Sequence, residues 1–208
     1  MSLYEGKIFP YLVNRVCSSE QVMSLKAKVI PLATGKVLEI GMGTGANLSL
    51  YNKNRVEFIW GLEPSAGMRK QACSNVEKSA VEVKWLDLPG EKIPLENESV
   101  DTIVLTFTLC SIPDWKLALQ QMHRVLKPEG KLLFCEHGRA PEVNVQKWQD
   151  RLNPFWKKIG GGCHLNRPIE SCLKETGFQF DDLQKMYMAS APRIVGYMYY
   201  GQASLQHF

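Results

Sequence analysis

Three closely spaced glycines mark the stretch of sequence best suited to hold a ligand. Gly41, Gly43 and Gly45 follow an apolar run and precede a stretch with helical spacing. Glycines in this position allow a tight turn and let the backbone approach a nucleotide-like ligand at the amino end of a helix. The same spacing also fits the dinucleotide fingerprint, and a glycine turn that only lets a helix pack is a third interpretation.

Two carboxylates favour the ligand-binding interpretation. Glu39 lies just before Gly41, inside the apolar run, where a buried carboxylate needs a partner such as the cationic amino group of a ligand. Glu63 ends the next apolar run, about twenty residues past the loop, where a carboxylate accepts hydrogen bonds from two ribose hydroxyls. A solvated charge at the end of a strand is the alternative for Glu63.

These residues belong to a series of motifs that resembles the class I S-adenosylmethionine-dependent methyltransferases, and within them the branch called methyltransferase type 11. The series comprises Val37–Asn47, Glu63, the stretch 93–101 and the stretch 125–130, and it covers roughly residues 35–136. Motifs found in this order are far more specific than the glycines alone. The resemblance implies an enzyme that uses S-adenosyl-L-methionine to methylate a small molecule.

The resemblance also implies which residues contact the cofactor. Its methionine portion is expected against the glycine loop, with Glu39 near the ammonium group and Glu63 at the ribose hydroxyls. Its adenine is expected near Asp87 and Leu88, and its sulfonium beside Thr106. The cofactor-binding residues predicted in this way are Glu39, Gly41, Met42, Gly43, Gly45, Glu63, Asp87, Leu88 and Thr106.

A narrower likeness points to the methyltransferase-like 7 group, which is linked to methylation of alkyl thiols. It rests on the segments that contain Cys110, His137, Trp148 and the stretch 162–167. The likeness does not extend to the hydrophobic N-terminal membrane segment of that group, so a thiol is one candidate acceptor among several. The substrate-binding residues that we predict are Cys110, Trp148, His164, Asn166 and Arg167.

A proton acceptor is needed only if the nucleophile arrives protonated, and for a thiol the reactive form is the thiolate. Glu136 ends the fifth apolar run and His137 follows it, and ligands of open α/β sheets bind at the carboxyl ends of strands. We therefore predict Glu136 and His137 as catalytic residues. For His137 the alternative is a polar loop residue, and for His164 it is an ordinary turn before a helix.

The order of elements predicts how these residues are positioned. Apolar, β-branched-rich runs at 36–40, 56–62, 81–86, 100–106 and 131–136 alternate with helical spacing at 46–51, 66–76 and 115–126. Such alternation predicts a parallel sheet with helices on both faces. A helix at 168–176 and two runs at 178–187 and 194–201 follow, and their short connection requires an antiparallel hairpin. The predicted fold is α/β, a three-layer Rossmann-like sheet of seven strands, mostly parallel, with an antiparallel C-terminal hairpin.

The whole chain, 1–208, is expected to form a single domain, because no repeat or long linker divides it. Residues 1–34 are interpreted as a helical cap, with Tyr4, Phe9, Tyr11 and Leu12 as candidate contacts, and residues 35–136 as the cofactor-binding core. Residues 137–167 are interpreted as a substrate lid, and residues 168–208 as the last helix and hairpin.

The stretch 145–159 allows three interpretations. Trp148, Leu152, Phe155 and Ile159 recur at helical spacing among basic residues, and Pro154 predicts an interrupted helix or the start of a second one. The stretch fits a helix packed on the domain, a substrate lid, or a segment that contacts a membrane surface or a partner.

Composition restricts the class of protein. Hydrophobic residues make up 45% and charged residues 22%, which is typical of a soluble globular protein. There is no apolar run of about 18 residues, and the N-terminal stretch lacks the features of a signal peptide, so a cytoplasmic location is expected. The six cysteines form no Cys-x-x-Cys pair, so reduced thiols and no metal site are predicted.

Three rival functions are weighed against methyl transfer to a small molecule. A short-chain nicotinamide oxidoreductase usually needs a Tyr-x-x-x-Lys pair, which the sequence lacks. A nucleic-acid methyltransferase usually shows an Asn/Asp-Pro-Pro-aromatic motif after the fourth run, and this sequence lacks that motif there. The net charge of +4 is also too small for a nucleic-acid footprint. A non-catalytic regulatory protein that binds S-adenosylmethionine would carry the same loop and stays open. The oligomeric state is not determined by the sequence.

Overall fold

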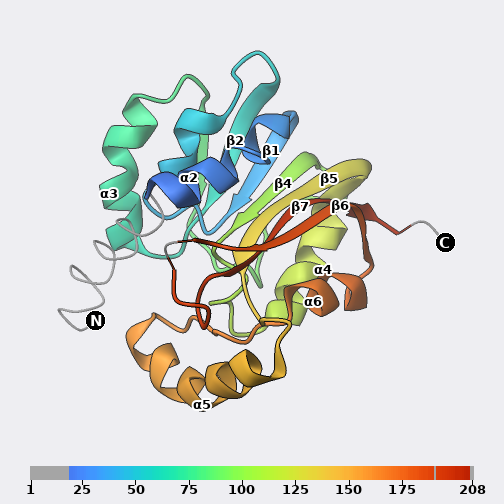
Figure 1. Cartoon of the computed structure of the whole chain (residues 1–208). Helices are drawn as coiled ribbons and strands as arrows, with labels where there is room; N and C mark the ends of the chain where they lie inside the picture. The colour runs from blue at the N-terminus through green and yellow to red at the C-terminus, as the bar shows by residue number, and fades with distance from the viewer. Residues whose placement is uncertain (1–18, 190, 207–208) are drawn as a thin grey trace.

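The computed structural model describes residues 19–189 and 191–206, and these form a seven-stranded sheet with the strand order β3-β2-β1-β4-β5-β7-β6 (Figure 1). The strands are β1 (Gly35–Ile40), β2 (Val56–Leu62), β3 (Val83–Leu86), β4 (Val100–Thr106), β5 (Leu126–His137), β6 (Phe178–Tyr187) and β7 (Tyr197–Leu205). The first five strands pair in parallel, whereas β7 runs antiparallel to both β5 and β6. The predicted sheet and its C-terminal hairpin are confirmed.

Helices cover both faces of the sheet, as the alternating pattern predicts. They are α2 (Glu20–Lys26), α3 (Ala66–Glu77), α4 (Trp115–Val125), α5 (Val143–Ile159) and α6 (Ile169–Glu175), with short 3-10 helices η2 (Ile30–Leu32) and η3 (Ala46–Leu50). Of the expected N-terminal cap, Tyr4, Phe9, Tyr11 and Leu12 lie outside the described residues.

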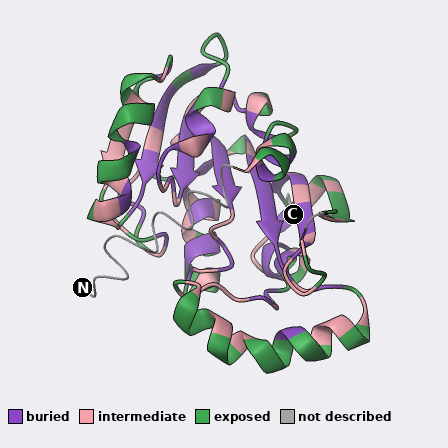
Figure 2. Cartoon of the chain, turned by 60° about the vertical axis from the view of Figure 1, so that its left-hand side comes forward, coloured by how far each residue is buried: buried purple, intermediate pink, exposed green. Residues whose placement is uncertain are grey.

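Successive strand side chains build a separate hydrophobic core on each face. In β1, Leu38 and Ile40 belong to one core and Val37 belongs to the other, because neighbouring side chains of a strand point in opposite directions. Helices α4 and α6 cover the first core, and α2, η2 and η3 cover the second. Figure 2 shows the buried strands between these layers.

Several boundaries differ from the prediction. Strand β5 begins at Leu126 rather than Lys131, because Leu126 already pairs with Val100 before a register shift in β4. Strand β7 begins at Tyr197 rather than Ile194 and extends to Leu205, opposite the first residues of β6. These differences lie at the ends of elements, where pairing with a neighbouring strand decides the boundary.

The interruption expected at Pro154 is wrong. Helix α5 runs unbroken over 17 residues, with Pro154 inside it. A proline removes one backbone donor from a helix, and tertiary contacts offset that loss here. On one side of Pro154 the side chain of Asp150 binds Arg139, and Asn153 accepts a hydrogen bond from the N–H of Leu165 at 2.9 Å.

Helix α5 lies beyond the carboxyl ends of the parallel strands and exposes its apolar residues (Figure 2). The exposed fraction is 53% for Trp148 and 67% for Phe155. Within the part of the chain that the structure describes, no helix has the length and hydropathy needed to cross a membrane.

Candidate active site

The glycine loop after β1 has the conformation that its sequence predicts. Gly41, Gly43 and Gly45 all have positive φ angles, of 64°, 58° and 72°. At Gly41 a Cβ atom would lie 2.4 Å from the side chain of Thr108, so packing excludes a larger residue there. At Gly43 a Cβ would meet, among the described residues, only the carbonyl oxygen of Gly41 at 3.8 Å. The loop is therefore open at Gly43, where a ligand can approach the backbone.

Glu63, at the end of β2, connects this loop to the start of α3. Its Oε2 accepts a hydrogen bond from the N–H of Gly43 at 2.9 Å, and its Oε1 accepts one from the N–H of Ser65 at 2.8 Å. Burial raises the pKa of Glu63, and these two amide hydrogen bonds partly offset that effect. Each carboxylate oxygen keeps a second lone pair, so the group can still accept hydrogen bonds from hydroxyls.

Glu39 is buried below the loop and has two neutral hydrogen-bond partners. Its oxygens accept hydrogen bonds from the Tyr51 hydroxyl at 2.7 Å and from Nδ2 of Asn47 at 2.8 Å. Burial raises the pKa of Glu39 to about 7, although the hydrogen bond from Tyr51 and the charge of Lys26 lower it. Oδ1 of Asn47 is buried and has no hydrogen-bond partner among residues 19–189 and 191–206. Oδ1 of Asn47 and the Glu39 carboxyl are therefore acceptors that a cationic group of a ligand could satisfy, in addition to Lys26, whose charge already acts on Glu39.

Two further predicted cofactor residues, Thr106 and Met42, lie in different surroundings. Thr106 is brought to Glu39, because Asn47 Nδ2 also donates to Thr106 Oγ1 at 2.9 Å. Met42 instead packs its side chain into the core against Gly61, where an added Cβ would lie 2.3 Å from its sulfur.

The region predicted for the adenine holds an ion pair. Asp87 is exposed and pairs with Arg69, which also donates to the carbonyl oxygen of Glu63, and Leu88 beside it is half-buried. The adenine contact of Asp87 stays a prediction. No role was predicted for Arg69, Tyr51 or Asn47. The only signal in the sequence is their position: Asn47 and Arg69 lie in the helices that follow the glycine loop and Glu63, and Tyr51 directly follows the first of these helices.

A strained residue marks the end of β4. Phe107 has a φ angle of 52°, which is rare for a residue with a side chain and is found most often at functional sites. Its ring stacks on the His137 imidazole with centroids 6.4 Å apart, and Nζ of Lys26 lies 5.6 Å from the ring centroid. Neighbouring groups therefore hold Phe107 in place at the carboxyl edge of the sheet.

Glu136 is fully buried at the end of β5. Its Oε1 accepts hydrogen bonds from the N–H groups of Thr108 at 2.7 Å and Leu109 at 3.0 Å, so it orders the loop after β4. Burial raises the pKa of Glu136 to about 7, despite these amide hydrogen bonds. Its Oε2 has no hydrogen-bond partner within the described part of the chain.

His137 lies beside two cysteines. Its Nε2 is 3.1 Å from Sγ of Cys163, and Cys110 is close to both. The hydrogen bond from Cys110, and that from His137, lower the pKa of Cys163 well below the usual value of a thiol. Burial alone would lower the pKa of His137, but the Cys163 interactions and the charge of Glu136 raise it overall. In the sequence, Cys163 stands out only as part of the stretch 162–167.

The predicted substrate residues have mostly structural contacts. His164 donates its main-chain N–H to the carbonyl oxygen of Cys110 at 2.9 Å, and Arg167 donates to the carbonyl oxygen of Ile112 at 2.9 Å. Asn166 donates to Asp150 on α5 at 2.8 Å. Cys110, His164 and Arg167 are thus brought together, whereas Trp148 lies on the exposed side of α5, 5.7 Å from the Arg151 guanidinium.

The chain is similar to proteins of known type. A family model described as a methyltransferase domain matches residues 38–134. Human thiol S-methyltransferase TMT1B is 34% identical over 195 residues, which cover 85% of this chain and 76% of that protein. Human thiol S-methyltransferase TMT1A is 30% identical over 213 residues, which cover 95% of this chain and 86% of that protein.

Solved structures share the fold at low sequence identity. A SAM-dependent methyltransferase from Methanosarcina mazei superimposes with a TM-score of 0.65 at 16% identity, covering 83% of this chain and 93% of that one. A SAM-dependent methyltransferase from Aquifex aeolicus gives a TM-score of 0.61 at 18% identity, with coverage of 96% and 98%. At these identities the likeness concerns the fold alone.

Proposed function

This chain belongs to the class I S-adenosylmethionine-dependent methyltransferases, and on that premise we propose that it methylates the sulfur of a small thiol. The chain is an enzyme of this class, and S-adenosyl-L-methionine is its cofactor. The observation that carries the thiol proposal is its 34% and 30% identity to two human thiol S-methyltransferases over most of the chain.

The residues around the glycine loop fit this cofactor. The carboxyl of Glu39 and the unpartnered Oδ1 of Asn47 are acceptors suited to the cofactor's ammonium group, and the carboxyl of Glu63 is suited to its ribose hydroxyls. When bound, S-adenosylmethionine supplies an electrophilic methyl group on a sulfonium. Because that methyl group is already activated, the protein's task is to position the acceptor and to exclude water.

A neutral thiol must lose its proton before it reacts, and we assign that proton to Glu136 rather than His137. Oε2 of Glu136 has no partner among the described residues, whereas Nε2 of His137 is already beside Cys163. In this proposal Glu136 accepts the proton and His137 positions Cys163.

Transfer of a labelled methyl group from S-adenosylmethionine tests this function. An alkyl thiol is offered beside an alcohol and an amine with the same carbon skeleton, and we expect labelled product from the thiol alone. The Glu136→Gln variant should lower kcat by about 10²–10⁴-fold, the usual contribution of a general base, while cofactor affinity by calorimetry stays unchanged.

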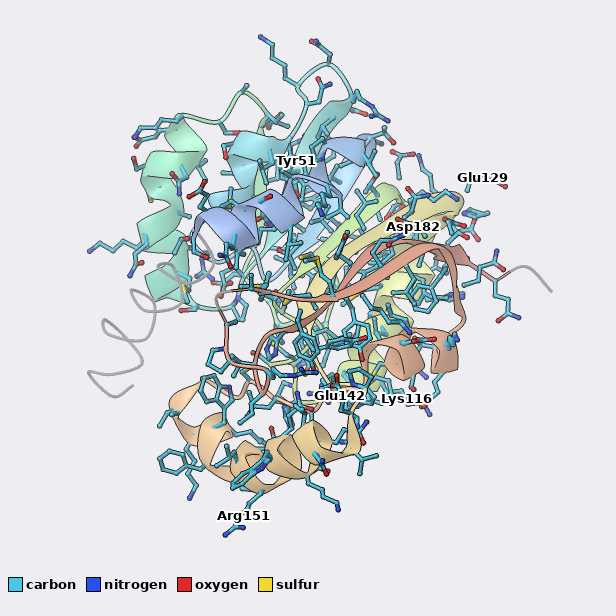
Figure 3. All side chains as sticks on the ribbon, in the orientation of Figure 1. Tyr51, Lys116, Glu129, Glu142, Arg151 and Asp182 are labelled. Atoms are coloured by element: carbon cyan, nitrogen blue, oxygen red, sulfur yellow. The ribbon has the colours of Figure 1, made fainter. Side chains whose placement is uncertain are left out.

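Glu129 offers a matched control for this experiment. It lies on the same strand as Glu136 but is exposed at the opposite end of β5, far from α5 (Figure 3). The Glu129→Gln variant should keep the wild-type rate. Methylation of the alcohol or amine in preference to the thiol would overturn the proposed acceptor, and equal loss of rate in both variants would overturn the role of Glu136.

A further inference from the structure

Three side chains of metal-binding type converge at the carboxyl edge of the sheet, although each comes from a different segment. Cys110 follows β4, His137 ends β5, and Cys163 follows α5. Their two sulfur atoms and one imidazole nitrogen all lie within 4.8 Å of one another. Cys110 and His137 are buried and Cys163 is half-buried, so the group is shielded on the protein side and open on another.

Hydrogen bonds outside this group hold the two cysteine segments together. The carbonyl oxygen of Cys110 accepts the main-chain N–H of His164 at 2.9 Å and also lies 3.0 Å from Nδ1 of His164. Cys163 itself follows Gly160–Gly162, in which Gly161 and Gly162 have positive φ angles that suit the tight turn. Outer contacts of this kind fix the orientation of metal ligands.

We propose that Cys110, His137 and Cys163 form a binding site for a divalent cation of the zinc class, with one coordination position left open. Thiolate sulfur and imidazole nitrogen are the ligands that zinc prefers. Among the described residues no fourth side chain of the metal-binding types joins this group. Zinc sites with three protein ligands are the ones that bind a substrate or water in the fourth position.

The open position gives this site a use that rests on the proposed function. The sulfur of an acceptor thiol is a suitable fourth ligand, and a thiol that coordinates zinc loses its proton. In this step the S–H bond breaks, its proton passes to the Glu136 carboxylate, and its electron pair stays on the sulfur. That pair then forms the bond to the methyl group, the bond from the methyl to the cofactor sulfur breaks, and a neutral thioether leaves beside S-adenosylhomocysteine.

Cobalt substitution tests the site without any assay of activity. The purified protein is stripped with a chelator under reducing conditions and titrated with Co²⁺, whose bonds to thiolate give a charge-transfer absorption band. We expect about one equivalent of cobalt per chain, displaced by Zn²⁺. The Cys110→Ser and Cys163→Ser variants should each bind cobalt about 100-fold more weakly or worse, because a change in an outer partner alone costs 10–100-fold.

Cys73 provides the matched control, since it is exposed on α3 and remote from the group. The Cys73→Ser variant should keep the full charge-transfer band. A band that persists in both Cys110→Ser and Cys163→Ser would overturn the proposal, and so would its absence from a wild-type protein that binds S-adenosylmethionine.

A measurement on the wild-type chain guards against variants that fail to fold. Bound Zn²⁺ should protect the half-buried Cys163, but not the exposed Cys73, from alkylation by iodoacetamide, as read by peptide mass spectrometry. Equal labelling with and without Zn²⁺ would overturn the site. Adding an alkyl thiol to the cobalt protein should change its visible spectrum, and an unchanged spectrum would overturn the use of the fourth position. An intact cobalt site in a protein that methylates no thiol would instead contradict the proposed function.

Discussion

At the scale of single residues, Glu39 shows how a binding site costs stability before its ligand arrives. The side chain is buried, and its partners Tyr51 and Asn47 are neutral. Two neutral hydrogen bonds do not compensate for burial of a carboxylate, and this imbalance raises the pKa of Glu39 to about 7. We expect the unfavourable charge in the free protein to attract a cationic group of the cofactor.

This imbalance predicts a specific dependence of stability on pH. The pKa of Glu39 is about 7 in the folded chain against an ordinary value of 4.5. A carboxyl whose pKa is raised by folding stabilises the folded state below the unfolded pKa, and that contribution is lost as the pH rises through 7. The contribution amounts to about 3 kcal/mol. The Glu39→Gln variant, which cannot ionise, should lose about 3 kcal/mol less stability than the wild type between pH 4.5 and pH 8.

Urea denaturation of the cofactor-free protein across this range measures the difference. Glu57→Gln serves as the control, because Glu57 is exposed on the neighbouring strand β2. That variant should follow the wild-type profile. Parallel profiles for Glu39→Gln and the wild type would contradict the assignment of this pH dependence to Glu39.

At the scale of elements, α5 is connected to the domain by one buried polar side chain, in addition to the more exposed contacts of Asp150 and Asn153. Gln149 is its only fully buried residue among those described, and the two hydrogens of its amide nitrogen are shared among the carbonyl oxygens of Gly138, Leu165 and Ile194. Its Oε1 accepts the N–H of Ala140 at 3.0 Å. A single glutamine thus connects α5 to the segments that follow β5 and precede α6 and β7.

Helix α5 also carries apolar residues that face solvent. The exposed fraction is 62% for Val143, 38% for Leu152 and 44% for Ile159. Arg151 also extends away from the body of the molecule on this helix (Figure 3). The lid and the membrane-contact interpretations of this stretch stay predictions.

We expect the Gln149→Ala variant to loosen α5 without unfolding the sheet. Loss of its four hydrogen bonds leaves buried backbone groups unpaired, which costs about 1–3 kcal/mol. Backbone amides of α5 should then exchange hydrogen on the order of 10–100-fold faster, while those of β4 and β5 keep their protection. Asn144→Ala, on the exposed side of the same helix, is the control. Equal acceleration in the helix and the sheet would show that Gln149 supports the whole domain rather than α5.

At the scale of the whole molecule, the site joins segments from both halves of the sheet. The glycine loop and Glu63 follow β1 and β2, whereas Phe107 and Glu136 end β4 and β5. In the strand order, β1 and β4 are neighbours although they are distant in sequence. A ligand that contacts both sides therefore stabilises the sheet at the point where its strand order reverses.

Cofactor binding should accordingly stabilise the entire domain against heat. A ligand at 100 times its Kd adds about 2.7 kcal/mol, which raises Tm by about 5–10 °C in a chain of this size. Thermal denaturation with S-adenosylmethionine and S-adenosylhomocysteine should show this shift, whereas NAD should leave Tm unchanged. In the Glu63→Ala variant the cofactor should bind about 1–3 kcal/mol more weakly, because buried polar groups lose their partner. A shift with NAD alone would contradict the assignment of the glycine loop.

Sequence alone was sufficient for the order of strands and helices and for the conformation of the cofactor loop. The two-sided burial of β1 and the turn at the glycines after it depend on interactions within a few residues. A short stretch of sequence is therefore enough to predict them. The antiparallel hairpin was predictable for the same reason, since its two runs are joined by too short a connection for a crossover. Glu39 was recognisable because a charged residue interrupts an apolar run.

Tertiary structure decided which side chains meet. Cys110, His137 and Cys163 lie in three separate segments, and only the pairing of β4 with β5 and the path of α5 bring them together. The absence of a Cys-x-x-Cys pair could not indicate this group, because spacing along the chain says nothing about such long-range convergence. Pro154 likewise disrupts a helix by local rules, yet contacts of α5 with distant segments keep it intact. Local conformation follows from neighbouring residues, whereas a site built across loops follows from the sum of many long-range packing contacts.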